Sequence, residues 1–268
     1  MMLHSVKRRV ARILYPYGSV RRVLAGPIRG TKYVVEPGMG VSFSLGQGMN
    51  YDFLAQRVSA GMTVYDIGAN RGQMALFFSN LVGTNGTVVS FEPVPSLFNS
   101  LDANLCLNQL DNVRPIQQAV SDETGQISFF FDPDRSTKGR LKKLVSAEST
   151  FEGEELTVDT TTIDSLIADG CPTPDVIKID VEGGAEGVLA GAARLLTGAK
   201  PLIYIELHSR LEMEAIGKHL LSRSYVAESL SGRRINDPNC DPVDALWLYS
   251  LEHQQRMNKD RITSDYVH

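Results

Sequence analysis

Two short segments of the chain concentrate side chains that could move a proton. The first contains Lys178, Asp180 and Glu182, and the second carries Glu206 and His208 two residues apart. A histidine or carboxylate held beside a substrate hydroxyl can act as a general base. Two other interpretations remain open. Clustered carboxylates can hold a divalent cation, and Lys178 can form a structural ion pair with Asp180 while His208 lies at the rim.

An apolar segment at 63–67 leads into a glycine-rich turn that comprises Asp66, Ile67, Gly68, Ala69, Asn70, Arg71 and Gly72. Glycines let the backbone turn sharply and approach a ligand, and the helix that follows offers free N–H groups to a negative group. A dinucleotide site would read G-x-G-x-x-G, and this turn does not. Asp66 would repel a pyrophosphate but suits a ligand with both an ammonium and a carboxylate group. The methionyl end of S-adenosylmethionine is such a ligand.

Two further strand ends suit the rest of that ligand. Glu92 and Pro93 follow the second apolar segment, where a carboxylate can accept both hydroxyls of a ribose. The third segment ends in Ala119, Val120 and Asp122, which could contact an adenine ring and its amino group. The predicted cofactor-binding residues are therefore Asp66, Gly68, Ala69, Asn70, Gly72, Glu92, Pro93, Ala119, Val120 and Asp122.

An alternation of strands and helices must position these residues. Apolar runs predict strands at 63–67, 87–91, 113–120, 175–180, 201–207, 225–229 and 245–250. Helical patterns lie between them at 73–81, 95–108, 162–168, 186–196 and 212–222. Such alternation predicts an α/β fold with a seven-stranded, mostly parallel sheet and helices on both faces. Ligands bind such sheets beyond the carboxyl ends of the strands, where the residues named above fall.

One region departs from the alternation. Segments 126–131 and 156–162 both have the pattern of strands and predict an extra β-hairpin, which spans 126–162 within a main domain of residues 61–252. The polar stretch 132–155 between them is predicted to be a mobile excursion. Because long loops often carry function, its lysines and arginines could close over an acidic glycan, although a solvated tip explains them equally well.

The two ends of the chain are predicted to lie outside the main domain. Residues 1–35 contain no acid, and apolar residues recur at helical spacing from Val6 to Tyr17. A basic amphipathic helix of this kind can cap its own domain, dock on an anionic membrane or acidic substrate, or serve as a transit peptide. Segments 32–35 and 41–43 predict a hairpin-like extension within residues 1–60, and residues 253–268 form a tail.

The overall composition narrows the class of protein. The chain has 268 residues and a net charge of -4, which argues against a nucleic-acid partner. Three scattered cysteines favour a reducing compartment, so a cytoplasmic location is expected. No apolar run approaches the length of a membrane span. The sequence carries no signal for an oligomeric state.

In their order along the chain, these motifs resemble the FkbM family of methyltransferases. The similarity spans about residues 30–250 and includes the segments at 64–72, 91–93, 119–122, 161–164, 177–183 and 205–208. The resemblance implies a Rossmann-like class I methyltransferase fold, S-adenosylmethionine as donor, and an oxygen acceptor on a sugar or natural product. One motif departs from the family pattern E-G-A-E, because Gly183 and Gly184 separate Glu182 from Ala185 and place the second acid at Glu186.

We therefore expect a methyltransferase that acts on a hydroxyl of a small molecule or glycan. Catalysis is assigned to Glu182, His208, Asp180 and Glu206, with Glu182 preferred over Glu186, and no residue is assigned to a metal. Two alternatives are a nucleotide-using Rossmann enzyme of another kind and a non-catalytic module that retains the cofactor pocket. Peripheral membrane contact through the basic N-terminus is a further expectation.

Overall fold

The computed structural model describes residues 15–36, 51–131, 139–141, 154–236 and 245–250. Within these ranges, eight strands form one sheet in the order β13-β12-β14-β11-β10-β3-β4-β5. Strands β5, β4, β3, β10 and β11 are parallel, and β14, β12 and β13 extend the sheet in antiparallel fashion. Their bounds are β3 Thr63–Ile67, β4 Thr87–Phe91, β5 Val113–Ile116, β10 Val176–Ile179, β11 Leu202–Glu206, β12 Tyr225–Ser229, β13 Arg234–Ile235 and β14 Ala245–Ser250.

The strand order reverses between β3 and β10. From β3 the chain adds β4 and β5 on one side, and then returns to add β10 and β11 on the other. The register of β3 and β10 sets Lys178 opposite Asp66 and Ile179 opposite Ile67. A crevice forms at such a switch point in doubly wound sheets. The turn after β3 and the turn after β10 therefore lie side by side.

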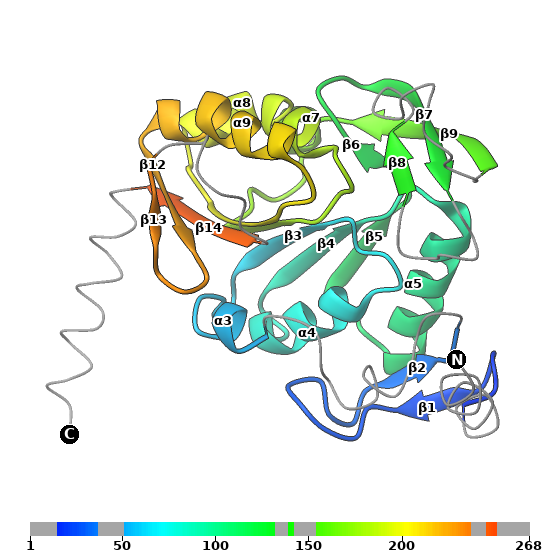
Figure 1. Cartoon of the computed structure of the whole chain (residues 1–268). Coiled ribbons are helices and arrows are strands. Elements are labelled where there is room, and N and C mark those ends of the chain that lie inside the picture. Colours follow the sequence, from blue (N-terminus) through cyan, green and yellow to red (C-terminus); the bar gives the residue numbers. More distant parts are fainter. Residues whose placement is uncertain (1–14, 37–50, 132–138, 142–153, 237–244, 251–268) are drawn as a thin grey trace, which may run out of the picture.

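Helices cover both faces of the sheet (Figure 1). The first face carries α3 Tyr51–Ala55, α4 Gln73–Val82 and α5 Pro95–Asn108, and the second carries α6 Ile163–Ala168, α7 Ala185–Ala190, α8 Ala193–Thr197 and α9 Arg210–His219. Successive strand residues point to opposite faces, so Val64 joins the first apolar core and Tyr65 the second. No helix in the described ranges is both long and apolar enough to cross a bilayer.

The prediction of one continuous strand at 113–120 is wrong. It is broken into β5 and β6 Ala119–Val120, and β6 leaves the main sheet to pair with β9 Glu154–Thr161. Pro115 in β5 has no N–H to donate, which suits the edge position that β5 occupies. Strand β7 Gly125–Phe131 pairs with β9 in antiparallel fashion, which confirms the predicted extra hairpin.

A second sheet results, with the order β6-β9-β7-β8, where β8 is Gly139–Leu141. Strand β8 falls in the predicted excursion, most of which lies outside the described residues. The expectation of seven strands in the main sheet is also corrected, since the described residues add the two-residue β13 beside β12.

The predicted helix at 186–196 is in fact two helices. Its break falls at Gly191, where an added Cβ would lie 2.0 Å from the carbonyl oxygen of Ser121. This close approach requires a glycine, and glycine is a poor helix former. The predicted helix at 212–222 likewise ends early, as α9 at His219 followed by a 3₁₀ turn, η2 Leu221–Arg223.

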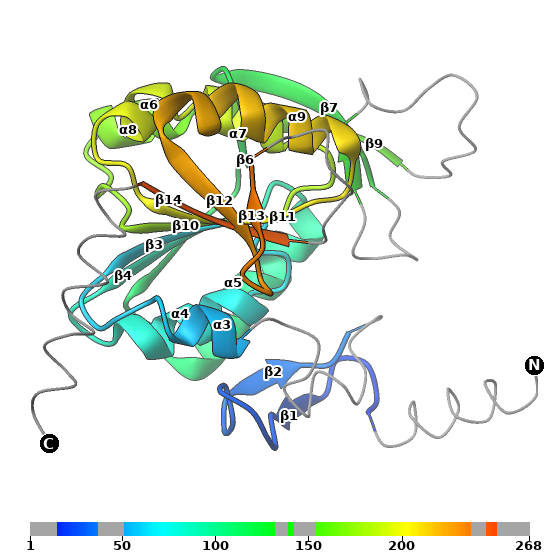
Figure 2. The same ribbon diagram turned by 60° about the vertical axis from the view of Figure 1, so that its left-hand side comes forward.

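A small antiparallel pair, β1 Val20–Arg22 and β2 Lys32–Val34, packs against α5 on the side of the sheet that carries α3 and α4 (Figure 2). The expected strand at 32–35 is thus present, but its partner is Val20–Arg22. The other expected strand, 41–43, lies outside the described residues, as do residues 1–14 with most of the predicted basic helix and the tail at 253–268.

Candidate functional site

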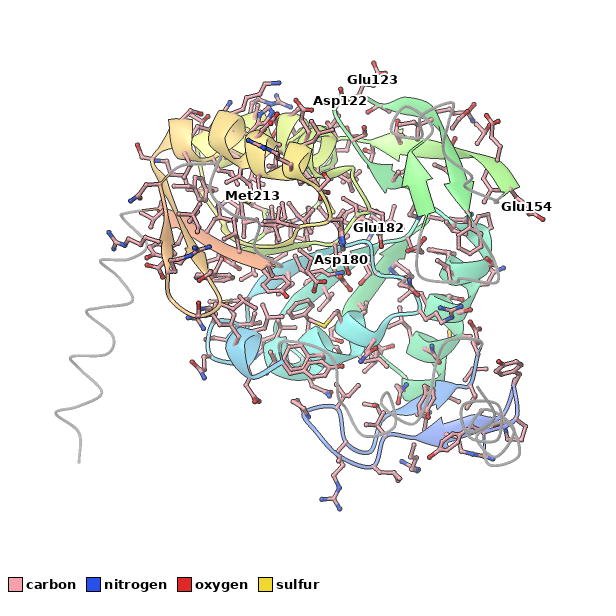
Figure 3. All side chains as sticks on the ribbon, viewed as in Figure 1. Asp122, Glu123, Glu154, Asp180, Glu182 and Met213 are labelled. Carbon is pink, nitrogen blue, oxygen red and sulfur yellow. The ribbon has the colours of Figure 1, made fainter. Side chains whose placement is uncertain are left out.

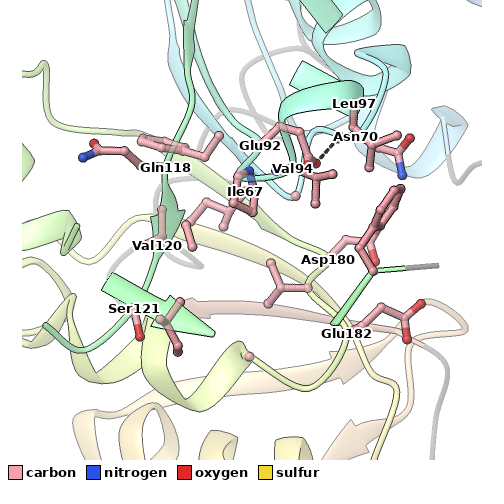
Figure 4. A pocket seen from close by; sticks show the side chains of 18 residues that line it. Ile67, Asn70, Glu92, Val94, Leu97, Gln118, Val120, Ser121, Asp180 and Glu182 are labelled. Carbon is pink, nitrogen blue, oxygen red and sulfur yellow. Dashed lines mark hydrogen bonds between the residues drawn. The ribbon is translucent and has the colours of Figure 1, made fainter. Parts of the chain in front are cut away.

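A pocket with an open volume of about 890 Å³, part of it continuous with solvent, lies at the carboxyl ends of β3, β4 and β10. Asp180 and Glu182 lie at one end of it, Val120 and Ser121 lie at the other, and Glu92 lies between them (Figure 4). Small molecules bind in concave sites at this edge of such sheets. The predicted residues Gly68, Asn70, Glu92, Pro93, Ala119, Val120, Asp180 and Glu182 all line the pocket.

Glu92 is almost fully buried, with 5% of its surface exposed. Its carboxylate accepts the main-chain N–H of Asn70 at 2.9 Å and that of Val94 at 3.0 Å. Burial raises the pKa of Glu92 to about 7, against these two hydrogen bonds, which lower it. Each carboxylate oxygen can accept a further hydrogen bond, and Glu92 lines the pocket, so it could accept hydroxyl groups there.

The pocket also has an apolar wall. Val94 and Leu97 come from the β4–α5 segment, Val120 from β6, and Ile127 and Phe131 from β7. An apolar wall on both sides of a carboxylate suits a ligand with an aromatic base next to a ribose. With acidic groups at the opposite end for an ammonium, the residues present fit S-adenosylmethionine. Gln118, Ile127 and Phe131 line the pocket and were not predicted, because a hairpin distant in sequence supplies the last two.

Lys178 lies behind the pocket and is 2% exposed. Its Nζ donates to the carbonyl oxygen of Gly68 at 2.9 Å and lies 3.2 Å from Asp66 Oδ1 and 3.3 Å from Asp180 Oδ2. Burial acts to lower the pKa of Lys178, but Asp66, Asp180 and Glu206 outweigh it and hold the pKa above its usual value. The ammonium therefore joins the turn after β3 to the turn after β10.

Asp66 does not line the pocket, contrary to its predicted contact with the ammonium of the cofactor. It has no exposed surface, and it points to the same face of the sheet as Lys178, with which it pairs. The sequence predicted correctly that an acid lies near this turn. The side chain of Asp66, however, lies within the sheet. Of the two aspartates beside Lys178, Asp66 stays within the sheet and Asp180 lines the pocket.

His208 and Asp180 form a hydrogen-bonded pair next to the pocket. Nε2 of His208 is 3.0 Å from Asp180 Oδ1, and Nδ1 is 3.9 Å from Glu182 Oε2. The hydrogen bond that His208 donates to Asp180 raises the pKa of His208 above its usual value, although burial opposes this shift. Burial raises the pKa of Asp180, but Lys178 and His208 outweigh burial and lower it to about 2. Asp180 therefore stays ionised and orients the imidazole.

Glu206 completes the predicted catalytic group but does not line the pocket. Its Oε1 accepts the hydroxyl of Tyr204 at 3.0 Å, and burial raises its pKa. One ligand atom from each of Asp180, Glu206 and His208 lies within 4.8 Å of the others, a spacing that a divalent cation could bridge. The Lys178 ammonium already supplies a positive charge beside Asp180 and Glu206. The ion pair between Lys178 and Asp180 and the cluster of Asp180, Glu206 and His208 are therefore present together.

Glu212, on α9, is a residue that the sequence reasoning missed. Its side chain is buried, and its carboxylate accepts the N–H of His208 at 2.6 Å and the N–H of Gly183 at 3.1 Å. Burial raises the pKa of Glu212, and the hydrogen bonds oppose this shift. One side chain therefore holds the main chain after β11 to the main chain after β10. An acid at the start of an amphipathic helix ordinarily faces solvent or caps the helix, so sequence alone would not single it out.

Glu186, the displaced second acid of the family motif, points away from the pocket. It lies in the first turn of α7 and is exposed, and its Oε1 is 2.8 Å from Lys218 Nζ. Glu182 lines the pocket instead. Gly183 has a φ of 86°, in the region that favours glycine, and it turns the chain between the two acids.

Besides Asp66, three predicted cofactor residues lie outside the pocket lining. Asp122 is exposed and accepts the hydroxyl of Ser121 at 2.8 Å, and Figure 3 shows it at the outer rim, away from Asp180 and Glu182. Gly72 has a φ of 88°, and an added Cβ would lie 2.6 Å from a side-chain carbon of Leu101. Its role is therefore close packing of α4 against α5. Ala69 is buried behind the turn.

Comparison with known proteins agrees with this geometry. The family described as methyltransferase FkbM domain matches residues 66–230, more than half of the 268 residues. The hexuronic acid methyltransferase AglP of Haloferax volcanii is 30% identical over 185 residues, which cover 65% of this chain and 71% of that protein. The crystal structure of methyltransferase FkbM from Methylobacillus flagellatus KT has the same fold, with 20% identity and a TM-score of 0.50. The similarity to that structure covers 72% of this chain but only 44% of that protein's length. The matched residues include the turn after β3, the acid after β4 and the pocket between them. The chain therefore belongs to the FkbM family of S-adenosylmethionine-dependent methyltransferases.

Proposed function

We propose that the enzyme transfers the methyl group to a hydroxyl oxygen of a sugar, with His208 as the general base. The observation that carries this proposal is the 3.0 Å contact between His208 Nε2 and Asp180 Oδ1 next to the pocket. Bound S-adenosylmethionine supplies an electrophilic methyl group. A hydroxyl attacks such a group better as its proton leaves, and a positioned histidine contributes to that step by about 10²–10⁴-fold.

The hydrogen bond to Asp180 determines which imidazole nitrogen is available. With Nε2–H donating to the ionised carboxylate, the lone pair of the neutral ring lies on Nδ1. Nδ1 is 3.9 Å from Glu182 Oε2, too far for a hydrogen bond, so the two groups can contact an acceptor together. In this assignment Nδ1 takes the proton of the reacting hydroxyl, while Glu182 accepts a hydrogen bond from a neighbouring hydroxyl and orients the ring.

A sugar acceptor is supported by the relative from Haloferax volcanii, which is named a hexuronic acid methyltransferase. A hexuronic acid offers two kinds of oxygen, a hydroxyl and a carboxylate. A carboxylate is already ionised and needs no base. The raised pKa of His208 favours this second candidate, because a protonated imidazole can bind an anion.

Local charge favours a hydroxyl over a carboxylate as the reacting group. Asp180, Glu182 and Glu206 surround His208, and Lys178 balances only part of their charge. A substrate carboxylate beside Nδ1 would meet this excess of negative charge, and like charges at such distances repel. A neutral hydroxyl avoids the repulsion. We therefore place the reacting oxygen on a hydroxyl, with any carboxylate of the sugar directed away from Glu182.

The test is product analysis with a labelled methyl donor and a matched acceptor set, consisting of a hexuronic acid, its neutral hexose counterpart and the corresponding methyl glycosides. A hydroxyl product is an ether, which survives mild alkali, whereas a carboxyl product is an ester, which does not. The proposal expects an alkali-stable label. A label released by alkali would establish carboxyl methylation, and transfer to none of the sugars would point to another acceptor.

His208→Ala separates catalysis from cofactor binding. The variant is expected to lose turnover by about 10²-fold or more, while its affinity for S-adenosylhomocysteine stays within about twofold, because His208 does not line the cofactor pocket. A variant with full activity would remove His208 from the mechanism.

A further inference from the structure

We infer that Glu36, which belongs to the N-terminal extension, is a positioning residue for the cofactor pocket. It follows β2 and precedes the family match, which begins at residue 66. It is also the first acidic residue of the chain. The N-terminal extension thus supports the cofactor turn from outside the matched segment, whatever the acceptor is.

Glu36 is tied to the cofactor turn by an ion pair. Its Oε2 accepts Nε–H of Arg71, and its Oε1 accepts the hydroxyl of Ser100 at 2.5 Å. The side chain of Arg71 is only 9% exposed, and that of Glu36 is 24% exposed. A charge-assisted hydrogen bond with so little solvent contact is stronger than an exposed ion pair. The carboxylate therefore fixes where the guanidinium lies.

A second side chain ties the same arginine to the extension through the main chain. Asn104, on α5, is 1% exposed. Its Nδ2 donates to the carbonyl oxygen of Arg71 at 2.9 Å, and its Oδ1 accepts the N–H of Val34 at 2.9 Å. Strand β2, helix α5 and the cofactor turn are therefore joined at Arg71, which has both its side chain and its backbone held.

Arg71 in turn holds Asn70, which lines the pocket. Its main-chain N–H and its Nη1 donate to Asn70 Oδ1 at 2.9 Å and 3.2 Å. Asn70 has a φ of 51°, in the left-handed region, which asparagine tolerates better than most residues and which the hydrogen bonds from Arg71 help to hold. The N–H of Asn70 then donates to Glu92 Oε2 at 2.9 Å. Glu36 thus acts on Glu92 through two intervening residues.

This arrangement predicts an effect on cofactor binding that is separate from turnover. Asn70 and Glu92 line the pocket, whereas Glu36 and Arg71 do not. The catalytic pair, Asp180 and His208, follows other strands. Loss of Glu36 should therefore loosen the turn and weaken the cofactor, while leaving the rate at saturating cofactor nearly unchanged.

The experiment uses the full chain with the substitution Glu36→Gln. Calorimetric titration with S-adenosylhomocysteine is expected to show a Kd raised by about fivefold or more, as befits the loss of a charge-assisted contact. Without ligand, amide hydrogen exchange across residues 68–72 should become faster. The KM for S-adenosylmethionine should rise, and kcat should stay within about twofold.

Asn108→Ala is the matched control. Asn108 also anchors the extension, because its Oδ1 accepts the N–H of Lys32 and its Nδ2 donates to the carbonyl oxygen of Lys32, each at 2.7 Å. It does not contact the cofactor turn, so its Kd should equal that of the wild type. An equal loss of affinity in both variants would mean that general loosening of the extension is responsible, and the inference would fail.

Two further variants decide the remaining outcomes. Glu36→Gln combined with Arg71→Gln should bind no more weakly than Arg71→Gln alone, since both act through one contact. Additive losses, or an unchanged Kd in folded Glu36→Gln protein, would overturn the inference. Should Glu36→Gln not fold, Ser100→Ala provides the test. It removes one of the two contacts to Glu36 and should raise the Kd by about twofold.

Discussion

Asp180 uses its two carboxylate oxygens for different partners, with Oδ1 3.0 Å from His208 Nε2 and Oδ2 3.3 Å from Lys178 Nζ. Lys178 is in turn held by Asp66 and by the carbonyl oxygen of Gly68. The imidazole that we assign as base is therefore oriented by a carboxylate that is itself fixed from inside the sheet. A structural ion pair and the proposed catalytic pair thus share Asp180.

The first prediction concerns the pH dependence of turnover. Asp180 raises the pKa of His208, and a base acts only in its deprotonated form. The rate should therefore fall as the pH drops through a value above 6.5, the ordinary pKa of histidine. Asp180→Asn should shift this midpoint downward and lower the plateau rate. Initial rates from pH 5.5 to 9 at saturating donor measure both, and an unshifted midpoint would exclude His208 as the titrating base.

The second prediction concerns the pH dependence of cofactor binding. Glu92 has a pKa raised to about 7 by burial, and it accepts ribose hydroxyls best when ionised. Binding then lowers this pKa, so affinity rises with pH up to about 7 and levels off above it. Titrations with S-adenosylhomocysteine at pH 6, 7 and 8 measure the trend. Glu92→Ala should bind about tenfold more weakly, since about 1.4 kcal/mol is one factor of ten, and should lose the pH dependence.

The third prediction concerns Glu212, which holds the N–H groups of His208 and Gly183. The amide oxygen of a glutamine at this position can accept one of these two hydrogen bonds. Its NH₂ group would then face the other main-chain N–H, and two donors cannot pair. Glu212→Gln should therefore lower kcat by about tenfold, in line with the cost of about 1–3 kcal/mol for an unsatisfied buried group, and leave cofactor affinity intact. Glu214→Gln, on an exposed position of the same helix, is the control and should behave as wild type.

The fourth prediction separates the two acids of the altered family motif. Glu182→Gln should lower turnover, because Glu182 lines the pocket and lies 3.9 Å from His208 Nδ1. Glu186→Gln should leave turnover unchanged and alter stability by less than about 1 kcal/mol, the usual value of an exposed ion pair. The opposite order of effects in steady-state assays would show that the turn rearranges when substrate binds.

The fifth prediction concerns metal dependence. Asp180, Glu206 and His208 lie close enough to bridge a cation, but Lys178 carries a fixed positive charge 3.3 Å from Asp180. We therefore expect activity to survive dialysis against a chelator. Loss of activity that Mg²⁺ or Mn²⁺ restores would instead identify the cluster as a metal site.

Much of the fold follows from local patterns. The runs at 63–67 and 87–91 match β3 and β4 residue for residue, and 95–108 matches α5, because each is an apolar or amphipathic run bounded by turn residues. The break between β5 and β6 depends on pairing with β9, about 40 residues later, which no local pattern reveals. The same holds for Ile127 and Phe131 in the pocket wall.

The candidate site was likewise predicted only where the position of a residue follows from its own strand. The rule that ligands bind at carboxyl strand ends placed Asn70, Glu92 and Asp180 correctly on the pocket. It failed for Asp66, because the last residues of a strand alternate between faces and only the register with β10 shows that Asp66 lies opposite Lys178. Glu212 could not be found either, since its partners are main-chain groups of two distant turns.

The β7–β9 hairpin has a consequence for protein engineering. Strand β7 supplies Ile127 and Phe131 to the pocket that we assign to the donor, while the residues between Phe131 and Glu154 join β7 to β9 in sequence. A chimera that exchanges the whole hairpin with a relative would replace part of the donor pocket and should impair donor binding. A chimera that exchanges only the segment between Phe131 and Glu154 keeps both strands. The second chimera should therefore retain donor binding.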